Sequence, residues 1–141
     1  MASLLGTWSY RSFINNPEPV ESAEDALGLI FGEGILTVFD ADPAHGFNAT
    51  LSFGGDAVMD LRGDVVAADP AGPVTARAIG AGRAGSPIAD FRYDYLFFEV
   101  PAWPIGIDQR QALVGSVVRA ADHGSARKGA TASTITVRRD T

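Results

Sequence analysis

Residues 47–65 alternate between apolar and polar side chains around a central pair of glycines, and this pattern limits the possible folds more than any other feature. The apolar positions are Phe47, Ala49, Leu51 and Phe53 before the glycines and Ala57, Met59, Leu61 and Val65 after them. A period of two residues is that of a β-strand with one buried face. Gly54-Gly55 is suited to a tight hairpin turn. The segment therefore predicts an antiparallel hairpin.

Six further segments resemble strands and are separated by residues that favour turns. They are Thr7–Ile14, Leu29–Asp40, Val74–Ala81, Ala89–Val100, Gln111–Ala121 and Ala130–Arg139. The 16 glycines and eight prolines argue against long helices, because each destabilises a helix interior. Only Val20–Leu27 predicts a short helix, with Ser22 and Asp25 as candidate capping residues.

Eight strands at nearly even spacing, mostly joined by short loops, predict one all-β domain over residues 1–141. We expect an eight-stranded antiparallel up-and-down β-barrel with a longer first loop. A barrel of this size encloses side chains or one small ligand, and its closure removes exposed strand edges. The alternative is a two-sheet sandwich or jelly roll.

Composition excludes several classes of function. The chain has no cysteine, which rules out disulfides, thiolate metal sites and a cysteine nucleophile. Its net charge of −6 and its short basic cluster, Arg127-Lys128, argue against a nucleic-acid partner. It has no apolar run long enough to span a membrane, and its first residues lack a secretory signal, so we expect a cytoplasmic protein without a membrane partner. Phosphate-binding glycine motifs and a Gly-x-Ser-x-Gly elbow are absent, and we expect no cofactor.

The first predicted strand begins with Gly6-Thr7-Trp8, and the last ends with Arg138-Arg139. This pairing resembles the calycin pattern of lipocalins and avidins, in which the Trp plugs the closed barrel end and the Arg packs over it. The long loop over residues 15–27 lies where lipocalins carry a lid. The length and glycine content are also similar to those of allene oxide cyclases and spirotetronate cyclases. We therefore predict that Trp8 is buried at one barrel end against Arg138 or Arg139.

An aromatic stripe in residues 89–99 supplies candidate ligand contacts, because Phe91, Tyr93 and Tyr95 share one face with Phe97. The predicted ligand contacts are Phe31, Met59, Phe91, Tyr93, Tyr95 and Trp103. The alternative is that the stripe is ordinary core. Trp103 lies in the loop over residues 101–110, which either recognises a ligand or plugs a barrel end, and we favour the plug.

Glu33 is the candidate catalytic residue. It shares its strand face with Phe31 and Ile35, which predicts a carboxylate inside the barrel. Burial raises the pKa of a carboxyl group, and a group of this kind exchanges protons with a substrate near neutral pH. Tyr93 or Tyr95 would orient a substrate carbonyl beside it. The alternative is that the glycines flanking Glu33 mark a bulge that turns it outward.

Asp40, Asp42 and His45 have the side chains of a metal site, but Asp-Pro sequences also build turns, and we expect no metal here. In an up-and-down barrel, the loops that carry His45 and His123 lie at opposite ends. These two histidines therefore cannot share one metal ion or one proton.

The sequence predicts a barrel that binds one small hydrophobic molecule in its interior. The alternatives are a cyclase or isomerase that uses an interior Glu/Tyr pair, and a filled-core structural or interaction protein. Leu96, Phe98 and Val100 form a second apolar face in the sixth predicted strand. An apolar outer face predicts a homo-oligomer, most simply a dimer.

Overall fold

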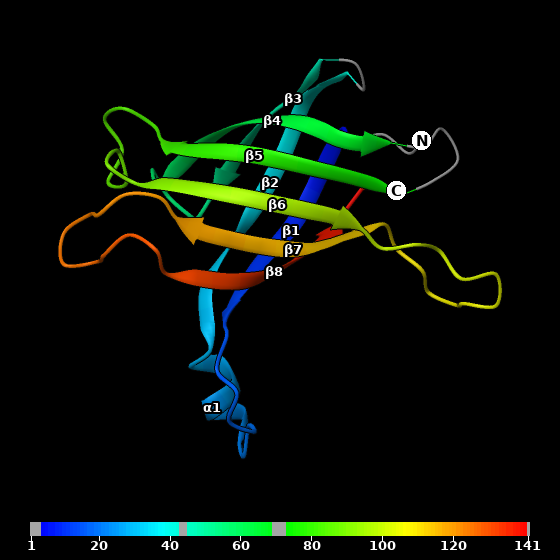
Figure 1. Ribbon diagram of the computed structural model, residues 1–141, viewed down its shortest axis with the longest axis horizontal. Coiled ribbons are helices and arrows are strands. Elements are labelled where there is room, and N and C mark those ends of the chain that lie inside the picture. Colours follow the sequence, from blue (N-terminus) through cyan, green and yellow to red (C-terminus); the bar gives the residue numbers. More distant parts are fainter. Residues whose placement is uncertain (1–3, 43–44, 69–72, 141) are drawn as a thin grey trace.

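Eight antiparallel strands follow one another around a closed barrel in chain order, and the last strand pairs with the first (Figure 1). The structure is a computed structural model and describes residues 4–42, 45–68 and 73–140. The strands are β1 (Gly6–Ile14), β2 (Ile30–Asp42), β3 (Gly46–Ser52), β4 (Val58–Ala68), β5 (Val74–Gly82), β6 (Arg92–Glu99), β7 (Ala112–Arg119) and β8 (Thr131–Arg138). The predicted up-and-down barrel is therefore confirmed, and the sandwich or jelly-roll alternative is wrong.

The hairpin predicted over residues 47–65 is formed by β3 and β4, with Leu51 opposite Met59. Both side chains are fully buried. The backbone turns at Gly54 and Gly55, whose φ angles of 108° and 54° lie in the region that favours glycine. The turn is one residue longer than predicted, because the N–H of Phe53 donates to the carbonyl of Ala57 at 2.9 Å.

β6 begins three residues later than the sequence predicts. Residues 86–91 form a turn instead, in which the N–H of Phe91 donates to the carbonyl of Ile88 at 2.9 Å. The Ile88 side chain is buried. The turn thus brings an apolar side chain over one end of the barrel.

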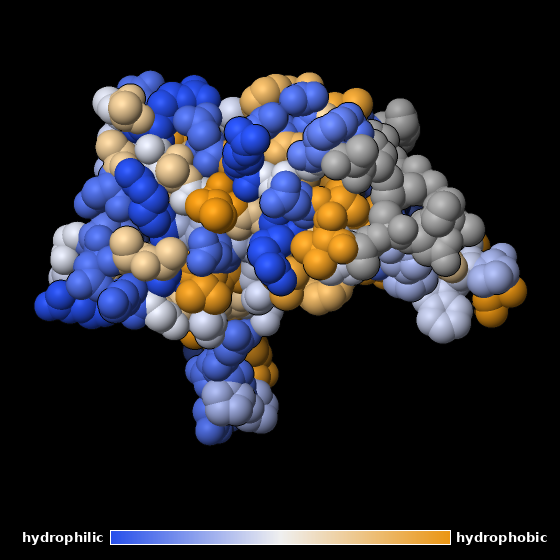
Figure 2. All heavy atoms as spheres, turned by 45° about the horizontal axis from the view of Figure 1, so that its top comes forward, coloured by the Kyte–Doolittle hydropathy of each residue, from blue (hydrophilic) through white to orange (hydrophobic). Residues whose placement is uncertain are grey.

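Several loops project from the barrel (Figure 1), and two of them bear on the sequence predictions. The first, between β1 and β2, carries α1 (Ala23–Leu27), where the Ser22 hydroxyl caps the helix by accepting the N–H of Asp25 at 3.1 Å. α1 buries none of its residues, and the described residues contain no helix long and apolar enough to cross a membrane. The second, between β6 and β7, has a hydrophobic tip at the right edge of Figure 2.

The second loop does not plug the barrel, so this sequence expectation is wrong. Trp103 is 70% exposed, and Ile105 and Ile107 are exposed even further. The loop folds on itself instead, because the side chain of Gln109 bonds to the backbone of Trp103 and to the carbonyl of Gly106.

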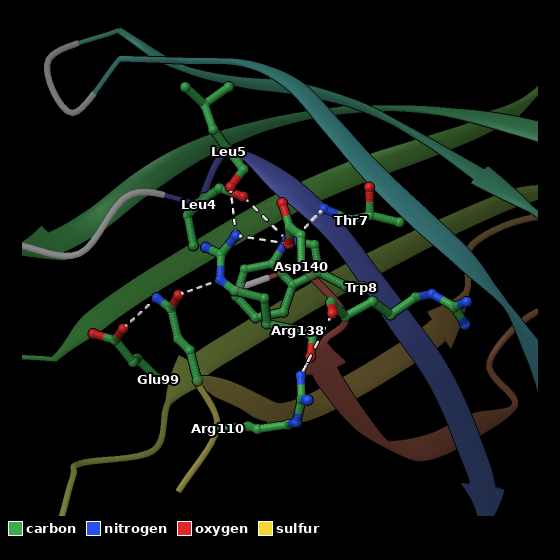
Figure 3. A network of polar contacts seen from close by, with 10 residues as sticks. Leu4, Leu5, Thr7, Trp8, Glu99, Arg110, Arg138 and Asp140 are labelled. Atoms are coloured by element: carbon green, nitrogen blue, oxygen red, sulfur yellow. Dashed lines mark hydrogen bonds and ion pairs between the residues drawn. The ribbon is translucent and has the colours of Figure 1, made fainter.

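Trp8 closes the barrel end from which the loop between β6 and β7 projects (Figure 3). Its side chain is fully buried, and its indole N–H donates to the carbonyl of Leu4 at 3.1 Å. The guanidinium carbon of Arg138 lies 4.3 Å from the centroid of the indole ring. The predicted contact between the first and last strands is therefore confirmed, with Arg138 rather than Arg139 as the partner.

Polar contacts hold Arg138 in place over the indole (Figure 3). Its Nε donates to Gln111 at 2.7 Å, and its Nη1 donates to the carbonyl of Leu5 at 2.6 Å and pairs with Asp140 at 3.2 Å. Gln111 in turn donates to Glu99 at 2.6 Å. The network links β8 to the chain before β1 and to β6, so this barrel end is closed by charge as well as by packing.

Candidate functional site

The other barrel end holds a pocket of about 170 Å³. Most of its wall is aromatic and comes from the rings of Tyr10, Phe31, Phe53, Phe91, Tyr93 and Tyr95. Ser12, Gly32, Ile88 and Val117 complete the lining. These residues come from β1, β2, β6, β7 and two turns, so the closed barrel brings together residues that lie far apart in the chain.

The rings of the pocket wall pack edge to face. The centroid of Tyr10 lies 6.5 Å from that of Phe53 and 6.0 Å from that of Tyr95, with interplanar angles of 83° and 75°. Phe31 meets Tyr93 at 6.2 Å and 86°. Edge-to-face contacts are the preferred geometry of aromatic pairs and fix each ring against its neighbour. The wall is therefore held in shape by its own members.

The floor of the pocket is polar but uncharged. Burial raises the pKa of Tyr10 to about 12, although hydrogen bonding with Ser12 and Tyr95 acts in the opposite direction. Burial, together with the nearby hydroxyl of Tyr10, also raises the pKa of Tyr95 well above its ordinary value. The Tyr95 hydroxyl donates to the sulfur of Met59 at 3.3 Å. Both hydroxyls therefore stay neutral at physiological pH.

Tyr93 joins the pocket to a polar cluster at its rim. Its hydroxyl lies 2.9 Å from Nε2 of His123 and accepts the Nε–H of Arg119 at 3.3 Å. The imidazole of His123 also stacks on Phe91, with centroids 3.6 Å apart. Since the hydroxyl already accepts a hydrogen bond from Arg119, its own proton is free to be donated to Nε2 of His123 in the tautomer that carries its proton on Nδ1.

The structure brings four of the six predicted ligand contacts into the pocket: Phe31, Phe91, Tyr93 and Tyr95. Met59 is fully buried beneath them and reaches the site only through Tyr95. Trp103 lies at the opposite end of the barrel, because the loop that carries it connects the closed-end termini of β6 and β7.

The prediction that Glu33 points into the barrel is wrong. Its side chain is 56% exposed and pairs with Arg11 at 2.7 Å on the outer surface. The inner face of β2 is set by β1, where Tyr10 pairs with Gly34 and Ser12 with Gly32. Glu33 faces outward, as the alternative expected, but the register with β1 is regular at its flanking glycines and no bulge lies there. The bulge lies at Phe31 and turns this ring into the pocket.

Asp42 and His45 form an exposed pair instead of a larger cluster, with Oδ2 and Nδ1 2.6 Å apart. This hydrogen bond raises the pKa of His45. The Asp40 carboxylate accepts from the amide of Asn48 at 3.1 Å. Among the described residues, no group of three or more acidic or histidine side chains has the arrangement of a metal site.

Site residues that were not predicted from the sequence include His123, Arg119, Tyr10 and Val117. A signal for His123 was present, because barrel topology places its loop at the same end as the start of the aromatic stripe. Arg119 had no such signal, because only the register between β6 and β7 in the structure places it directly opposite Tyr93.

Comparison with known proteins found no matching protein-family model, no matching curated protein and no matching solved structure. The chain is thus defined by its architecture, an eight-stranded closed barrel with an aromatic pocket at the end opposite Trp8.

Proposed function

We propose that the barrel binds one small apolar molecule, about the size of a single six-membered ring with a short substituent. The pocket volume of about 170 Å³ carries this proposal. A dry cavity of roughly 150 Å³ lined by apolar side chains is large enough to bind benzene. Each Å² of apolar ligand surface removed from water contributes about 25 cal/mol.

The chemistry of the pocket favours binding over the two alternatives. A filled-core protein leaves few voids larger than a water molecule, because interiors pack at the density of organic crystals. The interior Glu/Tyr pair of the enzyme alternative lacks its carboxylate, since Glu33 faces solvent. Phe31, Phe91, Tyr93 and Tyr95 are the ligand contacts that the proposal retains from the sequence.

Three further expectations belong to the proposal. The packing of Arg138 over Trp8 is the arrangement that a calycin resemblance implies, which supports a proposed relationship to lipocalins and avidins. The cytoplasmic location and the self-association through the outer face of β6 stay predictions.

The experiment is an NMR titration of the protein with ethylbenzene, monitored through backbone amide shifts. Gly32→Leu is the diagnostic variant, because a Cβ at Gly32 would lie 3.3 Å from the Ser12 hydroxyl and 3.6 Å from the Phe53 ring, at the pocket wall. We expect wild type to bind with saturable shifts around the pocket and Gly32→Leu to lose them.

The matched control is Gly28→Leu, at a glycine with right-handed helical backbone angles at the end of α1, outside the pocket. We expect this variant to bind ethylbenzene as wild type does. The proposal is wrong if wild type shows no saturable shifts, or if Gly32→Leu folds and still binds equally well.

A further inference from the structure

We infer that the natural ligand is a small aromatic carboxylate whose anionic group pairs with Arg119 at the pocket rim. The inference rests on the proposed function, since it assigns a chemical class to the molecule that fills the pocket. It depends on a second, separate observation, which is a guanidinium that lies against two rings of the pocket wall and, among the described residues, has no carboxylate partner.

The position of Arg119 follows from the barrel. It is the last residue of β7 and lies opposite Tyr93 on the inner face. Its guanidinium carbon lies 5.4 Å from the ring centroid of Phe31 and 6.0 Å from that of Tyr93. Both rings line the pocket and Arg119 is partly exposed, so its positive charge lies between the pocket wall and solvent.

The guanidinium keeps donors available. Nε donates to the Tyr93 hydroxyl, and Nη1 donates to the backbone carbonyl of Arg127 at 3.0 Å. A guanidinium has five N–H donors. Within the described part of the chain, the other three have no protein acceptor, and no carboxylate lies within 4.0 Å of Arg119.

The neighbouring acid is already engaged. Asp122 pairs with the side chain of Arg127 at 3.4 Å and accepts the N–H of Lys128 at 2.7 Å. Arg11 and Arg83, on the outer surface, each have a carboxylate partner at 2.7 Å. What sets Arg119 apart from these outer cations is its contact with two rings of the pocket wall, which allows a bound ligand to reach its charge.

The geometry favours a carboxylate. A guanidinium presents parallel N–H groups that match the two oxygens of a carboxylate. Arg119 supplies one positive charge, which matches a monoanion, whereas a phosphate ester carries nearly two negative charges. The ring of the ligand would lie among Phe31, Phe91 and Tyr93, with its carboxylate toward the rim.

The test compares benzoate with benzamide, which has nearly the same shape and no charge at pH 7.5. We expect wild type to bind benzoate about 10-fold to 100-fold more tightly in calorimetric titrations, as a charge-assisted hydrogen-bonded pair predicts. Arg119→Met should bind the two molecules equally. Arg119→Lys should retain part of the preference, because the charge stays but the paired donors are lost.

Arg83→Met is the matched control, because it removes the same charge from an exposed position outside the pocket. It should keep the full preference for benzoate. Near-UV circular dichroism of each variant checks that the barrel is folded.

The outcomes separate this inference from the proposed function. If wild type binds ethylbenzene but not benzoate, or prefers benzamide, the acidic ligand class is wrong and the apolar site stands. If wild type binds none of the three molecules, the proposed function itself fails. If Arg119→Met folds and keeps the full preference for benzoate over benzamide, another group selects the anion and the assignment to Arg119 is wrong. If Arg119→Met does not fold, the same conclusion follows from a folded Arg119→Lys that keeps the full preference.

Discussion

At the scale of single residues, Arg138 is expected to stabilise the barrel far more than its neighbour Arg139. Arg138 has a side chain that is 16% exposed and lies over the Trp8 indole, whereas Arg139 is exposed and donates to Ser9. A cation over an indole contributes about 0.5–2 kcal/mol, and hydrogen bonds from a charged group add about 1.5–3 kcal/mol. We expect Arg138→Met to lower the free energy of unfolding by about 2–4 kcal/mol in urea titrations. Arg139→Met is the control and should lower the free energy of unfolding by less than about 1 kcal/mol. Equal losses in the two variants would contradict the role of Arg138 in closing the barrel end over Trp8.

Tyr10 makes a prediction about alkaline pH. Its pKa is raised to about 12 in the folded state and is near 10 when unfolded. Between these values the folded chain holds a proton that the unfolded chain has lost, so stability is fully present below pH 10 and falls as the pH rises to 12. The loss is about 3 kcal/mol for two pKa units. Urea titrations from pH 9 to 12 should show a smaller loss of unfolding free energy in Tyr10→Phe than in wild type. If the unfolding free energy of the variant falls with pH as steeply as that of wild type, other groups cause the loss.

At the scale of elements, the loop between β1 and β2 is predicted to be dispensable. α1 buries no residue, no residue from 15 to 29 lines the pocket, and the N–H of Ile14 already closes the loop base on the carbonyl of Leu29 at 2.7 Å. Replacing residues 17–27 by Asn-Gly should change the free energy of unfolding by less than about 1 kcal/mol, because a shorter loop has a smaller closure entropy.

Ethylbenzene binding by this deletion variant should stay within about threefold of wild type, a difference worth less than 1 kcal/mol. A larger loss of affinity would mean that the loop acts as a lid, as the resemblance to lipocalins implies. Both properties can be measured on the same purified variant.

β2 and the hairpin of β3 and β4 show what strand patterns predict and what they do not. The hairpin has one apolar and one polar face, so its alternation alone identifies the buried side. β2 has large apolar residues on both faces, and the face of Phe31, Ile35 and Phe39 was predicted to be inside rather than the face of Gly32, Gly34, Leu36 and Val38. The opposite face is buried, because the large rings of β1 require small residues such as Gly32 and Gly34 beside them. Phe39 is left outside at a second irregularity in register.

Residues of the pocket could be predicted as a group only where several of them alternate along one strand. The alternation of Phe91, Tyr93 and Tyr95 identified the inner face of β6 from sequence. Tyr10, Val117 and His123 join them from other elements, and a pocket depends on the space that packed side chains leave between strands. That space is a property of the closed barrel and not of any one strand pattern.

At the scale of the whole molecule, an apolar row on the outer surface predicts self-association. Phe98, Val114 and Ile135 lie directly opposite one another across β6, β7 and β8, and each is at least 40% exposed. Val100 continues the row toward the hydrophobic loop that carries Trp103. We expect wild type to sediment as a dimer and Phe98→Lys as a monomer, because a lysine charge resists burial in an apolar contact.

Phe39→Lys is the control, since Phe39 is also exposed but lies on β2, outside this row. It should leave the sedimentation coefficient unchanged. A monomeric wild type would refute the predicted interface without affecting the pocket.

The pocket opposite Trp8 is the proposed ligand site, and its occupancy can be observed directly. The most direct measurement is of nuclear Overhauser effects between ethylbenzene and the methyl groups of the protein. We predict contacts with Ile88 and Val117, which line the pocket, and none with Leu4, which is buried beside Trp8. Contacts confined to the exposed Ile105 and Ile107 would contradict the claim, because they would show that the molecule binds the projecting loop and leaves the barrel interior empty.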